Sequence, residues 1–278
     1  MRAGDLFRIA SITKAMVASV VLQLVDEGVM RLDDTVERWQ PGLLAHGDEI
    51  TIAQLLGHVS GLPDPDLGRF VGRPGVAEED IVRQIARRRL DAPPGNRLAY
   101  RDVNYIVLGL VVEHVTGEPL DRVLQRRLFS SLGMPSATFV KEGVVPGGMV
   151  HGYVGHEDVT DLDIYWGEAA AGVAADGRDV SRFIRGLFAG GVLPESQLAV
   201  MVDVREHKIM HWTGYGLGMA RTQTDCGEAL GHSGRIPGYS SEAWAASDTS
   251  RSVVVLANTT SRSADRTLDT VVEAALCG

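Results

Sequence analysis

An apolar segment near the start of the chain has the spacing of a buried helix. Between residues 7 and 28 apolar side chains recur three and four positions apart, and Gly28 follows as a helix stop. The side chains that share one face of this helix are Met16, Val17, Val20, Val21, Leu24 and Val25. We therefore expect a helix that is packed inside the protein.

The rest of the pattern divides the chain into a helical part and a strand part. Helical spacing predicts helices at residues 79–90, 103–116, 120–132 and 179–189. Strands are predicted at 239–246 and 251–259, on either side of a turn, with a closing helix at about 264–276. The pattern indicates an α/β (α+β) protein, in which an antiparallel sheet is flanked by helices and lies beside an all-helical lobe.

Composition narrows the class of partner and the compartment. The 278 residues carry 27 basic and 36 acidic side chains, and the net charge of -9 disfavours nucleic acid as the main partner. The longest apolar run is too short to span a bilayer, and the first residues lack the apolar core of a signal peptide. As written, the chain is expected to be cytoplasmic. Cys226 and Cys277 make no framework, so we expect a fold that does not depend on disulfides.

Candidate chemistry begins where the first predicted helix begins. Ser11 and Lys14 are three positions apart, on the same side of the first turn and within hydrogen-bond reach. A serine becomes a nucleophile when a base removes its proton, and burial favours the neutral lysine amine that can act as that base. The alternative is a capping serine followed by a surface lysine. The chain has two other lysines, Lys141 and Lys208, and neither has a serine three positions before it.

Four further segments follow the SITK sequence at residues 11–14 in a fixed order. They are TIAQLLGHVSGLPD at 51–64, PPGNRLAYRDVNYIVLGLVVEHVTG at 93–117, YGLGM at 215–219 and GHSGRIPGYSS at 231–241. With these segments the chain resembles the serine β-lactamase and penicillin-binding-protein superfamily, on the branch that holds class C β-lactamases, D-alanyl-D-alanine carboxypeptidases, D-aminopeptidases and related esterases. The resemblance implies a β-lactamase/transpeptidase-like fold with one catalytic domain at 1–278. Its helical lobe would span about 46–204, and its sheet lobe would combine about 1–45 with 205–278.

The resemblance also implies roles for residues in the first half of the chain. Ser11 matches the family's nucleophile, and Lys14 matches its proton partner. Tyr100 matches the tyrosine of the Tyr-x-Asn element, which acts as general base or proton shuttle, and a nearby Lys14 would favour its phenolate.

In the second half of the chain, the resemblance implies a substrate-binding strand. His232, Ser233 and Gly234 match the family's Lys-Thr-Gly motif, which is commonly His-x-Gly in the peptidase and esterase members. The backbone N–H groups of Ser11 and Arg235 would then form the oxyanion hole.

Two departures from the family pattern bear on the substrate. Where the family often has Tyr-Ser-Asn, the chain has Tyr100-Arg101-Asp102, so a carboxylate replaces an amide that binds substrate. Asp102 should favour the charged form of Lys14, which moves the expected base toward Tyr100, and it would repel the carboxylate of a β-lactam. His232 stands where a lysine is common. We therefore expect ester or peptide cleavage, with weak β-lactam hydrolysis at most.

The segment before Ser11 is short for this family. Members usually carry two strands there, and ten residues leave no room for both. A strand around residues 253–257 would then lack a neighbour, and an unpaired apolar edge invites pairing with another chain. We expect either a homodimer that covers this edge or a true start upstream. An upstream piece could hold a secretion signal and place the protein outside the cytoplasm or in the periplasm.

Other candidate groups have simpler interpretations. His207 and His211 are four apart, but the segment HKIMH lacks the glutamate of a helical metalloprotease motif, so we expect no metal. His58 is expected to anchor a loop by hydrogen bonds, and Tyr105 is expected to lie in the core.

The favoured hypothesis is a serine hydrolase without a cofactor. It forms an acyl-enzyme at Ser11 and cleaves an ester or the amide of a short, D-configured peptide. One alternative is an acyltransferase of the same fold, and another is a binding protein that has lost catalysis.

Overall fold

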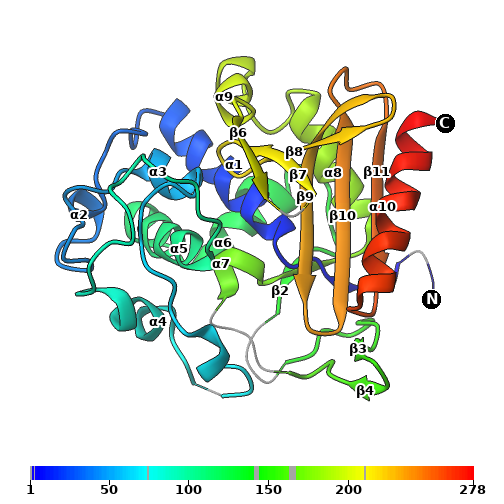
Figure 1. Cartoon of the computed structure of the whole chain (residues 1–278), viewed down its shortest axis with the longest axis horizontal. Helices are drawn as coiled ribbons and strands as arrows, with labels where there is room; N and C mark the ends of the chain where they lie inside the picture. Colours follow the sequence, from blue (N-terminus) through cyan, green and yellow to red (C-terminus); the bar gives the residue numbers. More distant parts are fainter. Residues whose placement is uncertain (1, 3, 74, 141–143, 163–166, 210) are drawn as a thin grey trace.

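The first predicted helix forms α1 (Ile12–Asp26) and lies at the centre of the molecule (Figure 1). The computed structural model describes residues 2, 4–73, 75–140, 144–162, 167–209 and 211–278. Nearly every residue of α1 is buried, including the polar Thr13, Lys14 and Ser19. The helix is enclosed because α5 (Asp102–Thr116), α7 (Glu168–Ala171) and β9 (Gly227–Ile236) all pack against it.

The other helices are mostly short, and all of those in the described residues except the closing one precede the strands of the main sheet. They are α2 (Val36–Trp39), α3 (Ile52–Leu56), the 3-10 turn η1 (Leu67–Arg69), α4 (Glu78–Ile85), α6 (Leu120–Leu124), the π-helical turn η2 (Gln125–Phe129), α8 (Gly177–Phe188), α9 (Glu195–Met201) and the closing α10 (Arg262–Cys277). The four helices predicted in this region all form. However, α4 ends five residues early because the backbone oxygen of Ala86 accepts a hydrogen bond from Ala45 instead of continuing the helix.

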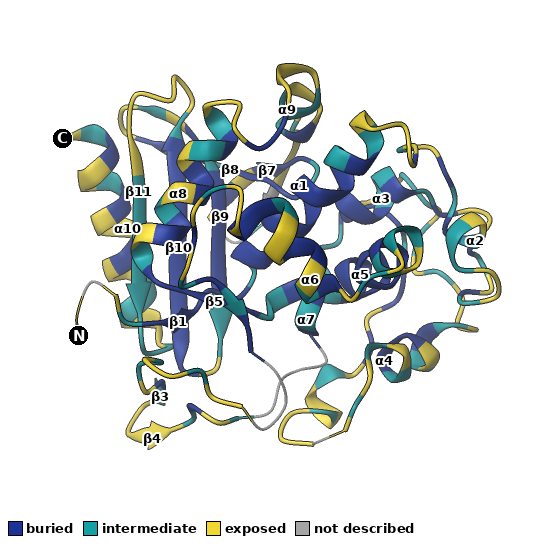
Figure 2. Ribbon diagram, turned by 180° about the vertical axis from the view of Figure 1, so that it is seen from behind, coloured by how far each residue is buried: buried dark blue, intermediate teal, exposed yellow. Residues whose placement is uncertain are grey.

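The last third of the chain folds into a six-stranded antiparallel sheet. Its order is β11 (Ser252–Ala257), β10 (Tyr239–Ala246), β9, β8 (Ala220–Thr224), β7 (Trp212–Tyr215) and β6 (Arg205–Ile209). The two predicted strands are β10 and β11, which confirms the antiparallel sheet with flanking helices. Several helices contact this sheet: α10 packs on β10 and β11, α8 packs on the same two strands, and α1 packs on β9 and β10. As a result, β10 is buried almost throughout (Figure 2).

Two smaller sheets connect the start of the chain to its middle. In one, β1 (Phe7–Arg8), β5 (Val173–Ala175) and β2 (Thr138–Phe139) pair in that order; the other contains β3 (Tyr153–Val154) and β4 (Glu157–Asp158). The predicted division into two lobes stays a prediction. Helix α8 lies within the range assigned to the helical lobe, yet it packs on β10 and β11.

The edge of the main sheet is where the sequence predicted it. Only β1 precedes α1 in the described part of the chain, and β11 pairs there with β10 alone. Residues 253–257 of β11 are half-buried, so an apolar strand edge is accessible. The homodimer that would cover it stays a prediction.

The two cysteines form a disulfide, so the expectation of a fold without one is wrong. Cys226, in the turn between β8 and β9, bonds to Cys277 at the end of α10. Their sequence separation of 51 gave no spacing signal, because the pair meets only when α10 packs beside the sheet. Among the helices of the described residues, none has the length and apolar character needed to cross a membrane.

Candidate active site

Ser11 sits at a strained junction between β1 and α1. The preceding Ala10 has a φ of +48°, a left-handed conformation that costs free energy in residues other than glycine. Two hydrogen bonds hold this junction: Ile9 N donates to Val173 O at 3.0 Å, and Ser241 Oγ donates to Ile9 O at 2.8 Å. The nucleophile candidate is therefore fixed by the middle and by the end of the chain together.

Lys14 is fully buried and uses all three protons of an ammonium group. Its Nζ donates to Ser11 Oγ at 3.0 Å, to Asp102 Oδ1 at 2.7 Å and to the backbone oxygen of Ala170 at 2.9 Å. Burial acts to lower the pKa of Lys14, but interactions with Asp102 and Tyr100 outweigh it and raise that pKa. Burial therefore acts on the pKa of Lys14 in the expected direction, and the expected opposing effect of Asp102 helps to outweigh it, so the amine is charged.

Tyr100 lies on the loop before α5 with its ring beside the ammonium of Lys14. Lys14 Nζ is 5.0 Å from the ring centre. The Tyr100 hydroxyl is buried and has no hydrogen-bond partner of ordinary geometry among the described residues. Burial raises the pKa of Tyr100, and the opposing effects of the Lys14 charge and the Ser11 hydroxyl do not cancel that rise. The phenol is therefore protonated at neutral pH in the resting protein, although Lys14 favours its phenolate as expected.

His58 anchors this loop, as the sequence predicted. Its Nδ1 accepts hydrogen bonds from Arg101 N at 3.2 Å and from Asn104 Nδ2 at 3.0 Å. Its ring lies 4.3 Å from the ring of Tyr100, centre to centre. Burial and the nearby charge of Lys14 hold the pKa of His58 well below its usual value, so the ring is neutral. His58 thus positions Tyr100 by packing and by holding the backbone that follows it.

Asp102 begins α5 and points its carboxylate at Lys14. The Asp102 side chain remains 34% exposed, while the Lys14 side chain is completely buried. The pair therefore joins an inaccessible cation to an anion that solvent and ligands can reach.

His232 faces the same region from β9 and is a neutral group. Burial lowers its pKa to about 3. Its Nδ1 lies 2.5 Å from Ser233 O, a carbonyl that can only accept, so Nδ1 carries the proton. Its Nε2 then accepts from the hydroxyl of Tyr215 at 3.0 Å. His232 is thus an uncharged ring with a hydrogen-bond partner at each nitrogen.

The side chains of Ser233 and Arg235 point away from Ser11, and the roles expected of these two residues stay predictions. Successive strand residues point to opposite faces, and Ser233 lies in register with Glu242 on the face away from Ser11. The Arg235 guanidinium lies on that face, where Nη2 binds Glu242 Oε1 at 2.7 Å and Nε binds Asp265 Oδ1 at 2.6 Å. Any part that these residues play near Ser11 comes from their backbone.

The backbone of β9 is placed so that it can offer an N–H group near Ser11. Ile236 and Tyr239 flank a two-residue turn and form a hydrogen-bonded pair, so the neighbouring Arg235 N–H points away from β10. Pairing with β8 stops at Gly231, which leaves this edge of β9 open. A Cβ on Gly234 would lie 2.3 Å from Ile9 O and 3.0 Å from Ala10 Cβ. Glycine therefore lets β9 approach the segment that leads into Ser11.

The other features that could bind a ligand lie apart from Ser11. His207 and His211 are not on a helix, since His207 lies in β6 and His211 in the turn before β7. His211, Glu242 and Asp269 bring potential metal-ligand atoms within 4.8 Å, but Glu242 already binds Arg235 and Trp244.

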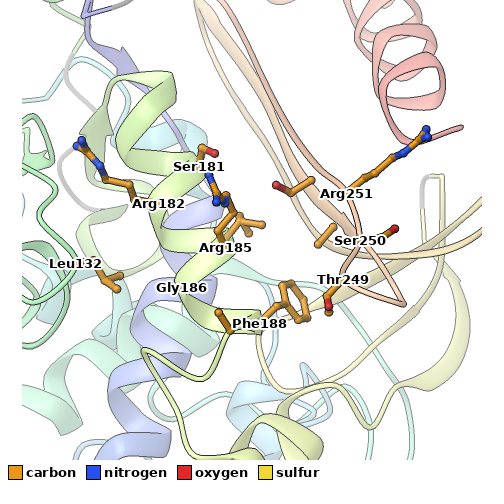
Figure 3. A pocket seen from close by; sticks show the side chains of 13 residues that line it. Leu132, Ser181, Arg182, Arg185, Gly186, Phe188, Thr249, Ser250 and Arg251 are labelled. Atoms are coloured by element: carbon orange, nitrogen blue, oxygen red, sulfur yellow. The ribbon is translucent and has the colours of Figure 1, made fainter. Parts of the chain in front are cut away.

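A cavity of about 750 Å³ lies between α8 and the turn from β10 to β11 (Figure 3). Its three arginines, Arg182, Arg185 and Arg251, point in different directions in that view. Arg182 binds Asp179, and Arg251 donates to the backbone oxygen of Leu276. The cavity offers no convergent chemistry comparable to that around Ser11.

Comparison with known proteins agrees with this geometry. The sequence profile of the family described as Beta-lactamase matches residues 1–277. The chain belongs to this beta-lactamase family.

Three relatives give the scale of similarity within the beta-lactamase family. Esterase EstB of Burkholderia gladioli is 37% identical over 157 residues, 50% of this chain and 40% of the esterase. A D-stereospecific amidohydrolase from Streptomyces sp. is 30% identical, with a TM-score of 0.85 over 92% of this chain and 83% of that one. D-amino acid amidase from Ochrobactrum anthropi SV3 is 27% identical, with a TM-score of 0.90 over 99% and 88%. The chain spans about a third of some curated relatives, with 33% for a protein from Bacillus subtilis (strain 168).

Three contributors to the site were not predicted from the sequence. Asn104 receives a hydrogen bond from Ser60 and donates one to His58, which ties the loop that follows α3 to α5. The sequence did hold one signal for Asn104: an asparagine within an apolar helix is expected to be buried, and a buried amide needs hydrogen-bond partners. Tyr215 lies in the YGLGM segment, but its contact with His232 could not be read from spacing. The backbone oxygen of Ala170 left no signal at all.

Proposed function

We propose that the protein is a serine hydrolase that forms an acyl-enzyme at Ser11. The observation that carries this proposal is the contact of Lys14 Nζ with Ser11 Oγ at 3.0 Å, beside the buried Tyr100 hydroxyl. Attack by Oγ on an ester or amide carbonyl forms the acyl bond and releases the alcohol or amine. Water then attacks the acyl-enzyme, so an acid is released and Ser11 regains its proton.

Tyr100 is the base that we assign to the first step. Lys14 is charged and donates all three of its protons, so it has no lone pair for the proton of Ser11. The phenolate oxygen of Tyr100 can take that proton, and the adjacent ammonium stabilises the phenolate as it forms. Tyr100 then returns the proton to the leaving group.

The backbone N–H groups of Ser11 and Arg235 are proposed to bind the oxygen of the attacked carbonyl. The N–H of Ser11 has no acceptor among the described residues, and that of Arg235 points away from β10. Two fixed donors stabilise the negative charge that develops on this oxygen, and losing one typically costs about 2.7–4 kcal/mol of barrier.

The substrate is proposed to be an ester or the amide of a short D-configured peptide. EstB is named an esterase, and the structural relatives are named a D-stereospecific amidohydrolase and a D-amino acid amidase. Neutral His232 and the Asp102 carboxylate lower the charge of the site, which disfavours a β-lactam carboxylate.

Hydrolysis of a neutral p-nitrophenyl ester tests this function. Ser11→Ala should abolish turnover while leaving the thermal unfolding transition in place. Ser19→Ala is the matched control, because Ser19 is a buried serine of the same helix that bonds to Ala15 O, away from the site. Turnover that survives in Ser11→Ala would contradict the proposal. Product analysis with an added amine or alcohol separates hydrolysis from acyl transfer.

We also propose that the protein works in an oxidising compartment and that it forms a homodimer. The Cys226–Cys277 disulfide favours an oxidising compartment over the cytoplasm. The open edge of β11 favours a homodimer, which sedimentation equilibrium would detect.

A further inference from the structure

Asp102 is the accessible charge beside the nucleophile. Lys14 Nζ bridges Ser11 Oγ at 3.0 Å and Asp102 Oδ1 at 2.7 Å, so the carboxylate and the nucleophile lie on two sides of one ammonium. Lys14 itself is inaccessible, whereas the Asp102 side chain is 34% exposed. The second carboxylate oxygen of Asp102 makes no hydrogen bond to any residue that the structure describes. It is therefore available to a ligand.

The cations near this group are already neutralised. All three Lys14 donors are used within the protein. Arg101 binds Asp91 at 2.8 Å, and the Arg235 guanidinium is held by two carboxylates on the far face of the sheet. His232 is neutral because burial lowers its pKa to about 3, and both of its ring nitrogens already have partners within the protein. A substrate carboxylate would thus find no free cation among these groups.

A second acidic group strengthens the negative field. Burial raises the pKa of Asp64, Arg101 opposes this rise, and repulsion from Asp102 and Asp91 adds to it. Asp64 is therefore close enough to feel the charge of Asp102. A cation entering beside Ser11 would be attracted by Asp102 directly and by Asp64 at longer range.

We propose that Asp102 binds an ammonium group on the acyl side of the substrate, next to the scissile carbonyl. The inference rests on the proposed function and assigns it a substrate class: amino acid amides, esters or peptides with a free α-amino group. Peptides blocked at the amine, and acyl groups that carry a carboxylate, are poor substrates. The proposed preference for a charged α-amino group is the one expected of an aminopeptidase or an amino acid amidase.

Placement of the scissile carbonyl fits this assignment. An α-amino nitrogen is bonded to the carbon next to the carbonyl, so it stays within a few ångströms of Ser11 Oγ during attack. The Lys14 ammonium separates Asp102 from Ser11 Oγ and donates a hydrogen bond to each of them. The other carboxylate oxygen of Asp102 can accept a hydrogen bond from the substrate ammonium. A charge-assisted hydrogen bond of this kind is worth roughly 10- to 100-fold in affinity.

Three p-nitroanilides that differ only at the α-nitrogen test the inference. They are D-alanine p-nitroanilide, its N-acetyl derivative and its N-succinyl derivative, which carry a cation, no charge and an anion. We expect kcat/KM to fall in that order, with a ratio of at least 10 between the first two. The ratio should collapse above about pH 8, where an α-amino group loses its proton. A ratio near 1, or one unchanged at high pH, would overturn the inference.

Variants assign the preference to Asp102. Asp102→Asn should reduce the cation-to-neutral ratio roughly 10-fold or more, and Asp102→Glu should restore part of it. Asp64→Asn is the matched control, since it removes the same charge from a neighbouring position. Equal losses in Asp64→Asn and Asp102→Asn would overturn the role of Asp102. If the enzyme hydrolyses a neutral p-nitrophenyl ester but shows no charge preference among the three p-nitroanilides, this inference alone is refuted. If no probe is turned over, the proposed function is refuted together with the inference.

Discussion

Gly234→Ala tests the close contact between β9 and the segment that carries Ser11. The new Cβ would lie 2.3 Å from Ile9 O, 2.5 Å from Ser241 Oγ and 3.0 Å from Ala10 Cβ. Ordinary contact at Ile9 O requires that β9 retreat by about 1 Å, a displacement that can cost about 100-fold in rate when it moves a catalytic group. Because the Arg235 N–H moves with the strand, we expect kcat for a p-nitrophenyl ester to fall about 10²–10³-fold. Overpacking should lower the free energy of unfolding by about 1–3 kcal/mol.

The control is a glycine whose replacement strains the same sheet elsewhere. A Cβ on Gly214 would lie 2.3 Å from Val204 Cγ1 and 2.6 Å from Arg205 O, between β7 and β6. Gly214→Ala should therefore lose stability by a similar amount and keep most of its kcat. Steady-state kinetics and urea unfolding of both variants give the two quantities. A folded Gly234→Ala protein with unchanged kcat, or equal kcat losses in both variants, would refute the reasoning.

Three further predictions follow from charge and covalent structure. Because burial raises the pKa of Tyr100 from its ordinary value and lowers that of His232 to about 3, kcat/KM for a neutral ester should climb with pH from 6 to 9 without an inflection near 6.5; a plateau from pH 7 would exclude Tyr100 as the base. Reduction of Cys226–Cys277, which closes a loop of 51 positions, should lower the free energy of unfolding by up to about 4 kcal/mol in urea titrations, and equal stability with and without reductant would contradict this. Burial raises the folded-state pKa of Glu242 from 4.5 to about 7, so the folded protein holds this proton more tightly than the unfolded chain and the free energy of unfolding should fall by up to about 3 kcal/mol as pH rises through that window. Glu242→Gln should flatten this slope, and an unchanged slope would assign it to other groups.

Local patterns predicted the parts of the fold and site that depend on local sequence. The spacing of apolar residues placed α1, α5 and the β10–β11 hairpin, because burial of one face or alternate faces imposes a period on the sequence. The short motifs brought Ser11, Lys14, Tyr100 and Asp102 together, and the structure places all four in contact or close to it. The sequence predicted both the effect of burial and the effect of Asp102 on Lys14, but the balance between them depends on distances that no spacing provides.

Features created by tertiary packing could not be predicted in this way. The direction of the Arg235 side chain depends on which face of β9 meets α10, and the disulfide depends on where α10 ends beside the sheet. The early end of α4 depends on a hydrogen bond from Ala45, which is distant in the sequence. Each of these features joins segments whose relative position is fixed only in the folded chain.

The central claim is that Ser11 carries the acyl group. Intact-protein mass spectrometry after mixing with a penicillin and, separately, with an activated ester tests it most directly, with Ser11→Ala as the control. The account predicts a mass increase equal to the acyl group, located at Ser11 by peptide mapping and absent from Ser11→Ala. No adduct and no released product with either probe, or an adduct that persists in Ser11→Ala, would contradict it.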